Sequence, residues 1–370
     1  MYGAAEPNKV KVAIVHDWFV GGGAERVVYE LHKMYPEAPI YTSYCSPQWR
    51  DKLSGAKVIT SYMQHWPFSK IRKFLPPLRA LWFSRLDLSG YELVISSSGA
   101  EAKGVRVEAP AVHINYCHAP THYYWSRYDD YLANPGFGRL DWLARLGLKI
   151  LLGPMRRWDY KAAQRPHHMI ANSNYTKDQI KKYYDRGSVV VHPPVEIDRF
   201  AHKYEEPRRG FVTASRQTPY KRIDLAVATC TKLNVPLVVL GSGPEHSRLK
   251  KMAGKSVTFL RGKSDEELAH YFQTSLAFIF PGVDDFGIVA VEALAAGTPV
   301  VAFARGGALD YIDAKTGILF KEQSVDSLAK ALDGFSSKTF HATDLAARAK
   351  EFSTVEFSKN ISRHINKFLV

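Results

Sequence analysis

Short apolar runs alternate with amphipathic stretches along the first half of the chain. Residues 11–15 form an apolar run with the length of a buried strand. A glycine cluster follows, and residues 24–31 then show helical periodicity. Further buried strands are predicted at 93–96, 111–114 and 168–171, with helical stretches between several of them. This alternation is typical of a parallel sheet flanked by helices.

The same alternation begins again in the second half of the chain. A strand is predicted at 210–214, a helix at 223–233 and a strand at 237–240. Further strands are predicted at 257–260, 276–280 and 299–303, and helices at about 265–273 and 287–296. The tail from residue 325 to residue 370 is predicted to be mainly helical. The chain therefore contains two separate blocks of strands and helices.

A stretch of different character separates the two blocks. His192-Pro193-Pro194-Val195 is extended, because a residue before proline is pushed out of the helical region, and residues 205–209 are polar. We therefore expect an α/β protein with two Rossmann-like parallel-sheet domains, at residues 1–195 and 196–355, and a terminal helix at 356–370 that packs back on the first domain. Ligands of open parallel sheets bind beyond the carboxyl ends of the strands, so both domains would present that edge to an interdomain cleft.

Length and cysteine content narrow the class of protein. A chain of 370 residues is too long for one ordinary core, and two domains are the usual outcome. The three cysteines, Cys45, Cys117 and Cys230, are too few and too far apart for a disulfide framework or a structural zinc site. We find no signal-peptide pattern at the start and no apolar run of membrane-spanning length, so we expect a cytoplasmic protein.

The formal net charge of +14 favours partners that carry phosphate. Nucleic acid, an anionic lipid surface and a diphosphate substrate all fit such a charge. Composition alone does not distinguish among these three, so the motifs of the sequence have to decide.

Three consecutive glycines, Gly21, Gly22 and Gly23, lie between a predicted strand and a predicted helix. Glycine lets the backbone approach a ligand closely, and the N–H groups at the start of the helix then face an anion. The alternative is a plain tight turn. The cluster is not the dinucleotide fingerprint, because Arg26 stands where that motif needs its last glycine, and a Walker A lysine is also missing.

Two cations follow the strand predicted at 210–214. Arg216 and Lys221 lie five residues apart beyond the carboxyl end of this strand. Such a pair can clamp a diphosphate and stabilise the charge on a departing phosphate. The alternative is a solvated basic loop.

A longer motif at residues 281–302 joins an acidic loop, a helix and a strand. Asp284 lies at the mouth of the helix that Gly287 opens, and Glu292 lies about a turn and a half inside it. The backbone N–H groups of residues 286–289 are placed to bind an anion at the positive end of the helix. Carboxylates only accept hydrogen bonds, which suits the hydroxyl groups of a sugar and a ribose.

This motif resembles the signature of glycosyltransferase family 4, whose members are retaining enzymes of the GT-B fold. The matching segments are Phe286-Gly287-Ile288-Val289, Glu292-Ala293 and Gly297-Thr298-Pro299-Val300, while Asp284 stands where the family carries a first glutamate. Further matches are His16-Asp17-Trp18, Gly22-Gly23-Ala24-Glu25-Arg26 and Arg305-Gly306-Gly307, with Asp310 where glutamate is usual. The resemblance covers essentially the whole chain.

The resemblance implies roles for particular residues. The catalytic residues would be His118, Arg216, Lys221 and Asp284. The donor-binding residues would be Gly22, Gly23, Arg261, Gly262, Lys263, Phe286, Gly287, Ile288, Val289 and Glu292. Arg216 and Lys221 would hold the diphosphate of the donor, and His118, which matches a His-x-Pro element, would polarise or bind a sugar hydroxyl. Asp284 would bind hydroxyls of the donor sugar and Glu292 those of the ribose.

The resemblance also implies a reaction course. The anomeric configuration would be retained through same-face attack, with the leaving phosphate accepting the acceptor's proton. No cofactor and no obligatory metal are expected if Arg216 and Lys221 neutralise the diphosphate. The adjacent pairs His167-His168, Asp129-Asp130 and Asp284-Asp285 are interpreted as structural or surface features rather than metal ligands. The backbone of Arg261-Gly262-Lys263 would contact the nucleobase. For His118 the alternative is a packed or surface residue, which is the more frequent role of a lone histidine.

The opening segments resemble mannosyltransferases of bacterial surface-polysaccharide assembly. This implies GDP-mannose as the donor and a polyprenyl-diphosphate-linked saccharide as the acceptor. Three alternatives stay open: a UDP-sugar-dependent transferase of the same family, a nucleotide-sugar epimerase of the same fold, and an inactive module that binds a sugar nucleotide or nucleic acid. Asp284 in place of glutamate is the best support for the inactive module.

Two segments of the first half combine basic and large apolar residues. Residues 65–86 carry five Lys and Arg and no acid, and residues 139–165 carry seven against Asp141 and Asp159. This combination suits attachment to an anionic membrane surface, which implies a peripheral position on the inner face of the cytoplasmic membrane. The alternative is a pair of core-packed helices with solvated basic rims. Nucleic acid is not expected as a partner, because no recognisable binding motif is present.

Overall fold

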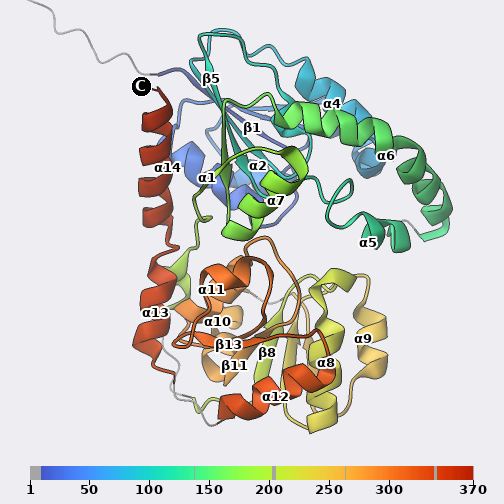
Figure 1. Cartoon of the computed structure of the whole chain (residues 1–370), viewed down its shortest axis with the longest axis vertical. Coiled ribbons are helices and arrows are strands. Elements are labelled where there is room, and N and C mark those ends of the chain that lie inside the picture. The colour runs from blue at the N-terminus through green and yellow to red at the C-terminus, as the bar shows by residue number, and fades with distance from the viewer. Residues whose placement is uncertain (1–9, 137, 202–205, 263, 337–339, 370) are drawn as a thin grey trace, which may run out of the picture. The chain divides into compact units, whose positions relative to one another are not determined.

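The computed structural model describes residues 10–136, 138–201, 206–262, 264–336 and 340–369 (Figure 1). The chain divides into two compact units. The first unit comprises Met1–Pro193 with Ser358–Val370, and the second comprises Pro194–Phe357. Each unit is built on one parallel sheet whose strands are connected mainly through helices.

The first unit contains a seven-stranded parallel sheet with the order β3-β2-β1-β4-β5-β6-β7. Its strands are β1 (Val12–His16), β2 (Ile40–Thr42), β3 (Val58–Thr60), β4 (Leu93–Ser98), β5 (Val112–Cys117), β6 (His168–Ala171) and β7 (Val189–Val190). β1 and β4 are buried along their whole length. Such strands have apolar or small residues throughout, because helices cover both faces of the sheet.

The helices of the first unit vary from single turns to one long helix. They are α1 (Ala24–Met34), α2 (Pro47–Lys52), α3 (Phe68–Ile71), α4 (Pro76–Ser84), α5 (Tyr128–Ala133), α6 (Asp141–Ala163) and α7 (Asn174–Tyr184). The 3-10 helices are η1 (Tyr62–Gln64), η2 (Arg72–Phe74), η3 (Ala102–Gly104) and η4 (Gly138–Leu140). The last helix of the chain, α14 (Thr354–Leu369), belongs to this unit from Ser358 on, and there Phe368 stacks on His168 with 3.8 Å between ring centres.

The second unit contains a six-stranded parallel sheet with the order β10-β9-β8-β11-β12-β13. Its strands are β8 (Phe211–Ala214), β9 (Leu237–Leu240), β10 (Val257–Leu260), β11 (Ala277–Phe280), β12 (Val300–Phe303) and β13 (Gly317–Phe320). Its helices are α8 (Ile223–Leu233), α9 (His246–Met252), α10 (Asp265–Thr274), α11 (Ile288–Ala295), α12 (Val325–Ser336) and α13 (Ala342–Lys350), with the 3-10 helices η5 (Ile197–Phe200), η6 (Pro219–Lys221) and η7 (Gly306–Asp310).

Helix α11 lies in the core of the second unit. Ala290, Val291, Ala293 and Leu294 are fully buried in one cluster, and this cluster includes the ring of Phe278 from β11. Glu292 is the one charged residue of α11, and a helix with so few polar residues is buried rather than presenting a polar stripe to solvent. The core therefore holds the start of α11 in a fixed position beside the loop that follows β11.

The strand order reverses in the middle of each sheet, and each reversal places two loops side by side. In the first unit the reversal lies between β1 and β4, and the Asp17 carboxylate after β1 accepts hydrogen bonds from the N–H groups of Gly99 and Ala100 after β4, at 2.7 and 2.9 Å. In the second unit the reversal lies between β8 and β11. Open α/β sheets bind their ligands at such points.

The structure confirms the predicted fold class, since both units have the Rossmann-like architecture of parallel strands and helices. It corrects the interpretation of the basic segment 65–86 at one residue. Arg79 is buried and forms an ion pair with Glu101 at 2.9 Å, so its charge does not lie on the surface. No helix in the described part of the chain combines the length and the apolar character needed to cross a membrane.

Candidate active site

In the second unit the loops after β8 and β11 lie against each other. Gly282 packs so closely on the backbone of Tyr220 and Lys221 that a side chain there would come within 2.9 Å of it. This close approach brings the ammonium group of Lys221 onto the Asp284 carboxylate, where the two form an ion pair. Their side chains are only 16% and 11% exposed. The two residues are 63 positions apart in the chain and meet because their strands are neighbours.

The Asp284 carboxylate is only half satisfied. Oδ2 accepts from Lys221, while Oδ1 is buried and has no hydrogen-bond partner among the residues that the structure describes. A buried acceptor without a partner costs about 1–3 kcal/mol, so a hydroxyl group that donates to this oxygen would be favoured there. Oδ1 of Asp284 is therefore a suitable acceptor for a ligand hydroxyl.

Glycines and a buried phenol fix the backbone around Asp284. Gly306 has a φ of +84°, and a side chain there would come within 2.6 Å of the Asp284 carbonyl oxygen. The same carbonyl accepts the N–H of Gly307 at 2.9 Å. The Tyr311 hydroxyl donates to the Phe286 carbonyl at 2.9 Å. Burial, with a further contribution from Asp284, raises the pKa of Tyr311 well above its ordinary value, so the phenol stays a neutral donor.

The loop after β11 ends at Gly287, which opens α11. Gly287 has a φ of +94°, and no side chain caps the helix that follows. The ring of Phe286 is 3% exposed and contacts Tyr311, so only its backbone can face a ligand. Ile288 and Val289 form the first turn of α11, whose N–H groups have no partner within the helix. Glu292 is 3% exposed and lies one turn further on, inside the unit.

Arg216 and Lys221 lie on one loop but in different surroundings. Arg216 is exposed, and its guanidinium forms no ion pair with a described residue. Between it and Lys221 lies Gln217, a fully buried residue that donates to the Gly241 carbonyl at 3.0 Å. The other end of the Gln217 amide bonds to the His246 ring at 2.7 Å. The structure therefore anchors this loop at Gln217 and leaves the Arg216 charge available.

A surface hollow of about 620 Å³ lies beside this loop, at the carboxyl end of β10. Its walls are His246, Ser247, Lys250, Phe259, Leu260 and Arg261. Burial, assisted by the charges of Arg261 and Lys250, lowers the pKa of His246. Gly262 follows with a φ of +60° and open space around it. The predicted base-contacting residue Lys263 lies outside the described residues.

In the first unit the glycine cluster folds around a carboxylate of the chain itself. Glu25 accepts the N–H groups of Val20 and Gly21 at 3.1 and 2.8 Å. A side chain on Gly22 would come within 3.1 Å of the same carboxylate, and Gly23 precedes the first residue of α1. The N–H groups of Val20 and Gly21 are thus already used, which leaves the residues from Gly22 on as the part of the cluster that can meet an anion.

His118 lies at the carboxyl end of β5, in the first unit. Its Nε2 bonds to the Ser97 hydroxyl at 2.7 Å, and the Ser97 carbonyl contacts Nδ1 of His16 at 2.9 Å. The His118 carbonyl accepts from the Asn172 amide at 2.9 Å. The ring is half-buried, so part of it stays accessible at the sheet edge. His118 is thus a positioned histidine rather than an isolated surface residue.

Sequence reasoning missed three residues that fix loops within one unit or the other. Gln217, Tyr311 and Asp17 each bond the backbone of a loop that is distant in sequence. Only Asp17 lies in a segment that the sequence had singled out, and no pattern in the sequence marks the hydrogen bonds of Gln217 and Tyr311. Within the described ranges no group of three or more His, Cys, Asp or Glu side chains is placed to hold a metal ion.

Two family models match the chain, one for each unit. Residues 21–199 match the model described as Glycosyltransferase Family 4, and residues 194–352 match the model described as Glycosyl transferases group 1. The two matches adjoin within a few residues of Pro194, where the second unit begins.

Curated relatives match over part of their length. A D-inositol 3-phosphate glycosyltransferase of Streptomyces avermitilis is 30% identical over 204 residues, covering 45% of this chain and 44% of the relative. A GDP-mannose-dependent alpha-(1-6)-phosphatidylinositol monomannoside mannosyltransferase of Mycolicibacterium smegmatis is 31% identical over 192 residues, covering 43% of this chain and 50% of the relative. The chain thus spans about half the length of the curated relatives it matches.

Solved structures match over nearly the whole chain. HepE of Anabaena, in complex with UDP and glucose, has a TM-score of 0.67 at 15% identity and covers 97% of this chain and 100% of its own. The sucrose-phosphate synthase of Thermosynechococcus elongatus has a TM-score of 0.69 at 15% identity, with 97% of this chain and 99% of its own covered. At this identity the likeness shows the fold alone.

Proposed function

Because this chain belongs to the glycosyltransferases that join a family 4 domain to a group 1 domain, we propose that it transfers a sugar from a nucleoside diphosphate sugar to a lipid-linked saccharide. Mannose from GDP-mannose is the proposed donor group. The name of the mycobacterial relative, a GDP-mannose-dependent mannosyltransferase acting on a phosphatidylinositol monomannoside, supports both the donor and the lipid character of the acceptor.

The single observation that carries the proposal is the Lys221–Asp284 ion pair where the strand order of the second unit reverses. The ammonium of Lys221 and the guanidinium of Arg216 are proposed to bind the donor's diphosphate and to neutralise it as it leaves. Charge-assisted hydrogen bonds of this kind are worth most where water is excluded, as around the largely buried Lys221. The first N–H groups of α11 add a positive helix end to the same region.

The carboxylates are proposed to bind hydroxyl groups. Asp284 would use its unpartnered Oδ1 for the donor sugar, and Glu292 would bind the ribose. The hollow beside Arg261 would receive the nucleobase, with the adjacent Gly262 allowing close approach of the backbone. For Gly22 and the neighbouring Gly23 we keep the expected contact with the phosphates, and for His118 a hydrogen bond to a sugar hydroxyl.

The proposed reaction retains the anomeric configuration. The bond between the anomeric carbon and the diphosphate oxygen breaks, and the acceptor's hydroxyl oxygen bonds to that carbon from the same face. The acceptor's proton passes to the leaving phosphate oxygen, so no pair of catalytic carboxylates at hydrolase spacing is required. Arg216 and Lys221 stabilise the charge that this departure leaves on the diphosphate.

The test is a transfer assay with a short-chain lipid-linked saccharide and a panel of GDP- and UDP-sugars. We expect product with GDP-mannose, with the configuration of the new linkage equal to that of the donor by NMR. If only a UDP-sugar gives product, the donor is a UDP-sugar and not GDP-mannose. Sugar isomerisation without any acceptor would identify an epimerase, and tight nucleotide binding without turnover would identify an inactive binding module.

A further inference from the structure

The long helix α6 of the first unit has one buried face and one exposed face. On the buried side Ala144, Met155 and Asp159 face the unit, and Met155 packs in one cluster with Ala80 and Tyr124. In Figure 1 the part of α6 near its label runs beside α4, the helix that carries Ala80. Among the described residues of the first unit, these contacts hold the helix from one side.

The opposite face is apolar in the first half of α6. Trp142 is 63% exposed and Ile150 is 64% exposed, with Leu143 and Leu146 each at 47%. These positions recur at helical spacing, so they form one stripe along the helix. Soluble monomers rarely expose several large apolar side chains together, and such a patch usually marks an interaction surface.

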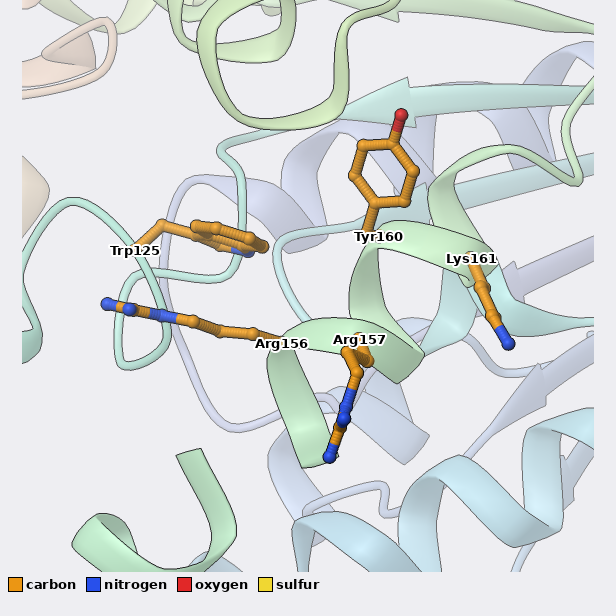
Figure 2. A pocket seen from close by; sticks show the side chains of 5 residues that line it. All are labelled: Trp125, Arg156, Arg157, Tyr160 and Lys161. Carbon is orange, nitrogen blue, oxygen red and sulfur yellow. The ribbon is translucent and has the colours of Figure 1, made fainter. Parts of the chain in front are cut away.

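The same stripe becomes cationic in the second half of α6. Arg156, Arg157, Tyr160 and Lys161 lie about one and a half to three turns beyond Ile150, and with Trp125 they line a hollow of about 290 Å³. Figure 2 shows the Arg156 side chain lying alongside the ring of Trp125. Its guanidinium carbon is 5.3 Å from the centre of that ring, and its Nε donates to the Tyr124 carbonyl at 2.5 Å.

The charge of this hollow is not neutralised by the protein. No acid is among the residues that line it, and neither Arg157 nor Lys161 forms an ion pair with a residue that the structure describes. Asp159 is on the same helix but points away, into the unit, where it pairs with Lys103 at 2.6 Å. Its other oxygen accepts the indole N–H of Trp125 at 2.7 Å, which fixes the wall of the hollow. An anion is therefore the ligand that suits this hollow.

We propose that α6 docks on an anionic lipid surface, with the hollow of Arg156, Arg157 and Lys161 holding the phosphate group of a lipid and the apolar stripe from Trp142 to Ile150 entering the interface. Guanidinium groups match phosphate oxygens in geometry, and cations beside large apolar side chains bind anionic membranes through both charge and burial. The inference rests on the proposed function in one respect: a lipid-linked acceptor would lie in the membrane on which α6 docks.

The experiment is flotation of the full chain with phosphatidylcholine vesicles, with and without phosphatidic acid. The wild-type protein should float with the anionic vesicles and not with the neutral ones. The double charge reversal Arg157→Glu with Lys161→Glu should lower the bound fraction at least about tenfold, because each basic group near the surface contributes. Trp142→Ser with Ile150→Ser should lower it as well, since these side chains supply the apolar contact.

The matched control reverses two exposed charges elsewhere in the same unit, Lys11→Glu with Lys57→Glu, which precede β1 and β3 at the amino ends of these strands. Equal loss in this control and in the α6 variants, or full flotation of the α6 variants, would overturn the proposal. Binding to a single-stranded oligonucleotide without flotation would instead assign the hollow to nucleic acid. Donor hydrolysis without vesicles should be unchanged in the α6 variants, so the failure of docking can be told from the failure of the proposed transferase activity.

Discussion

At the scale of single residues, Lys221 pairs with Asp284 in the structure and with the donor's diphosphate in the proposed function. In the structure it neutralises Asp284, whose second oxygen is buried without a described partner. A bound diphosphate would share the ammonium, and a sugar hydroxyl would satisfy the free carboxylate oxygen. The pairing compensates two largely buried charges, because either charge alone would be costly to bury.

A second residue-scale feature is His113, a fully buried histidine of β5. Its Nε2 contacts the Ser96 hydroxyl at 2.8 Å. Burial lowers the pKa of His113 to about 3, and the charges of His167, Arg165 and Arg186 act in the same direction. The unfolded chain has a pKa of about 6.5 at this residue, so it takes up a proton first as the pH falls. The stability due to neutral His113 is complete above about pH 6.5 and is lost progressively toward pH 3.

We therefore predict that His113→Gln flattens the pH dependence of stability. As the pH falls from 6.5 to 5, this group alone should lower the free energy of unfolding of the wild type with a slope that rises from about 0.7 toward about 1.4 kcal/mol per pH unit. The variant lacks this term, whatever its stability at pH 7, because glutamine does not titrate. Urea unfolding of both proteins across this range measures the two slopes, and parallel slopes would contradict the assignment.

At the scale of elements, the junction between β11 and α11 depends on one glycine. Gly287 has a φ of +94°, and a side chain there would come within 2.7 Å of the Phe280 ring and the Tyr311 hydroxyl. Both neighbours are buried, so neither has room to move away. The direction of α11, and with it the place of Glu292, follows from this one position.

Gly287→Ala should lower the free energy of unfolding by about 1–3 kcal/mol, the range for a strained backbone and an overfilled contact. Gly147→Ala is the matched change in α6, where no atom lies within 4 Å of the added methyl group. That variant should be neutral or slightly stabilising, because alanine favours a helix over glycine. Thermal unfolding compares the two; an unaffected Gly287→Ala protein would show that the junction is not constrained.

The sequence predicts the longer elements well and the shortest ones poorly. Apolar runs such as 237–240 stand out between polar turns and coincide with β9. β2, β3 and β7 were not predicted, because two or three residues are too few to show a periodicity. The motif at 281–302 was found because its residues are contiguous, whereas the contact between Lys221 and Asp284 depends on strand order, which spacing along the chain does not reveal.

At the scale of the whole molecule, both units use the same device to place functional groups. Each sheet reverses its strand order once, and at each reversal a carboxylate joins the two neighbouring loops. Asp17 accepts the N–H of Gly99 in the first unit, and Asp284 pairs with Lys221 in the second. The fold thereby offers one loop-lined edge in each unit. Each unit also carries a separate group of cations. Lys221 lies at the edge of the second sheet, and Arg156, Arg157 and Lys161 lie on α6 of the first unit.

The turnover number of a Lys221 variant with GDP-mannose and a lipid-linked saccharide measures whether Lys221 stabilises the leaving diphosphate. Lys221→Ala and Lys221→Gln should each lower kcat at least about 100-fold, the usual cost of losing a charge contact in the transition state. Lys232→Ala, which breaks an exposed ion pair with Asp326, should leave kcat within about twofold, since such pairs contribute little. If both Lys221 variants, shown to be folded by circular dichroism, keep kcat within about threefold of the wild type, Lys221 does not stabilise a leaving diphosphate and the account is contradicted.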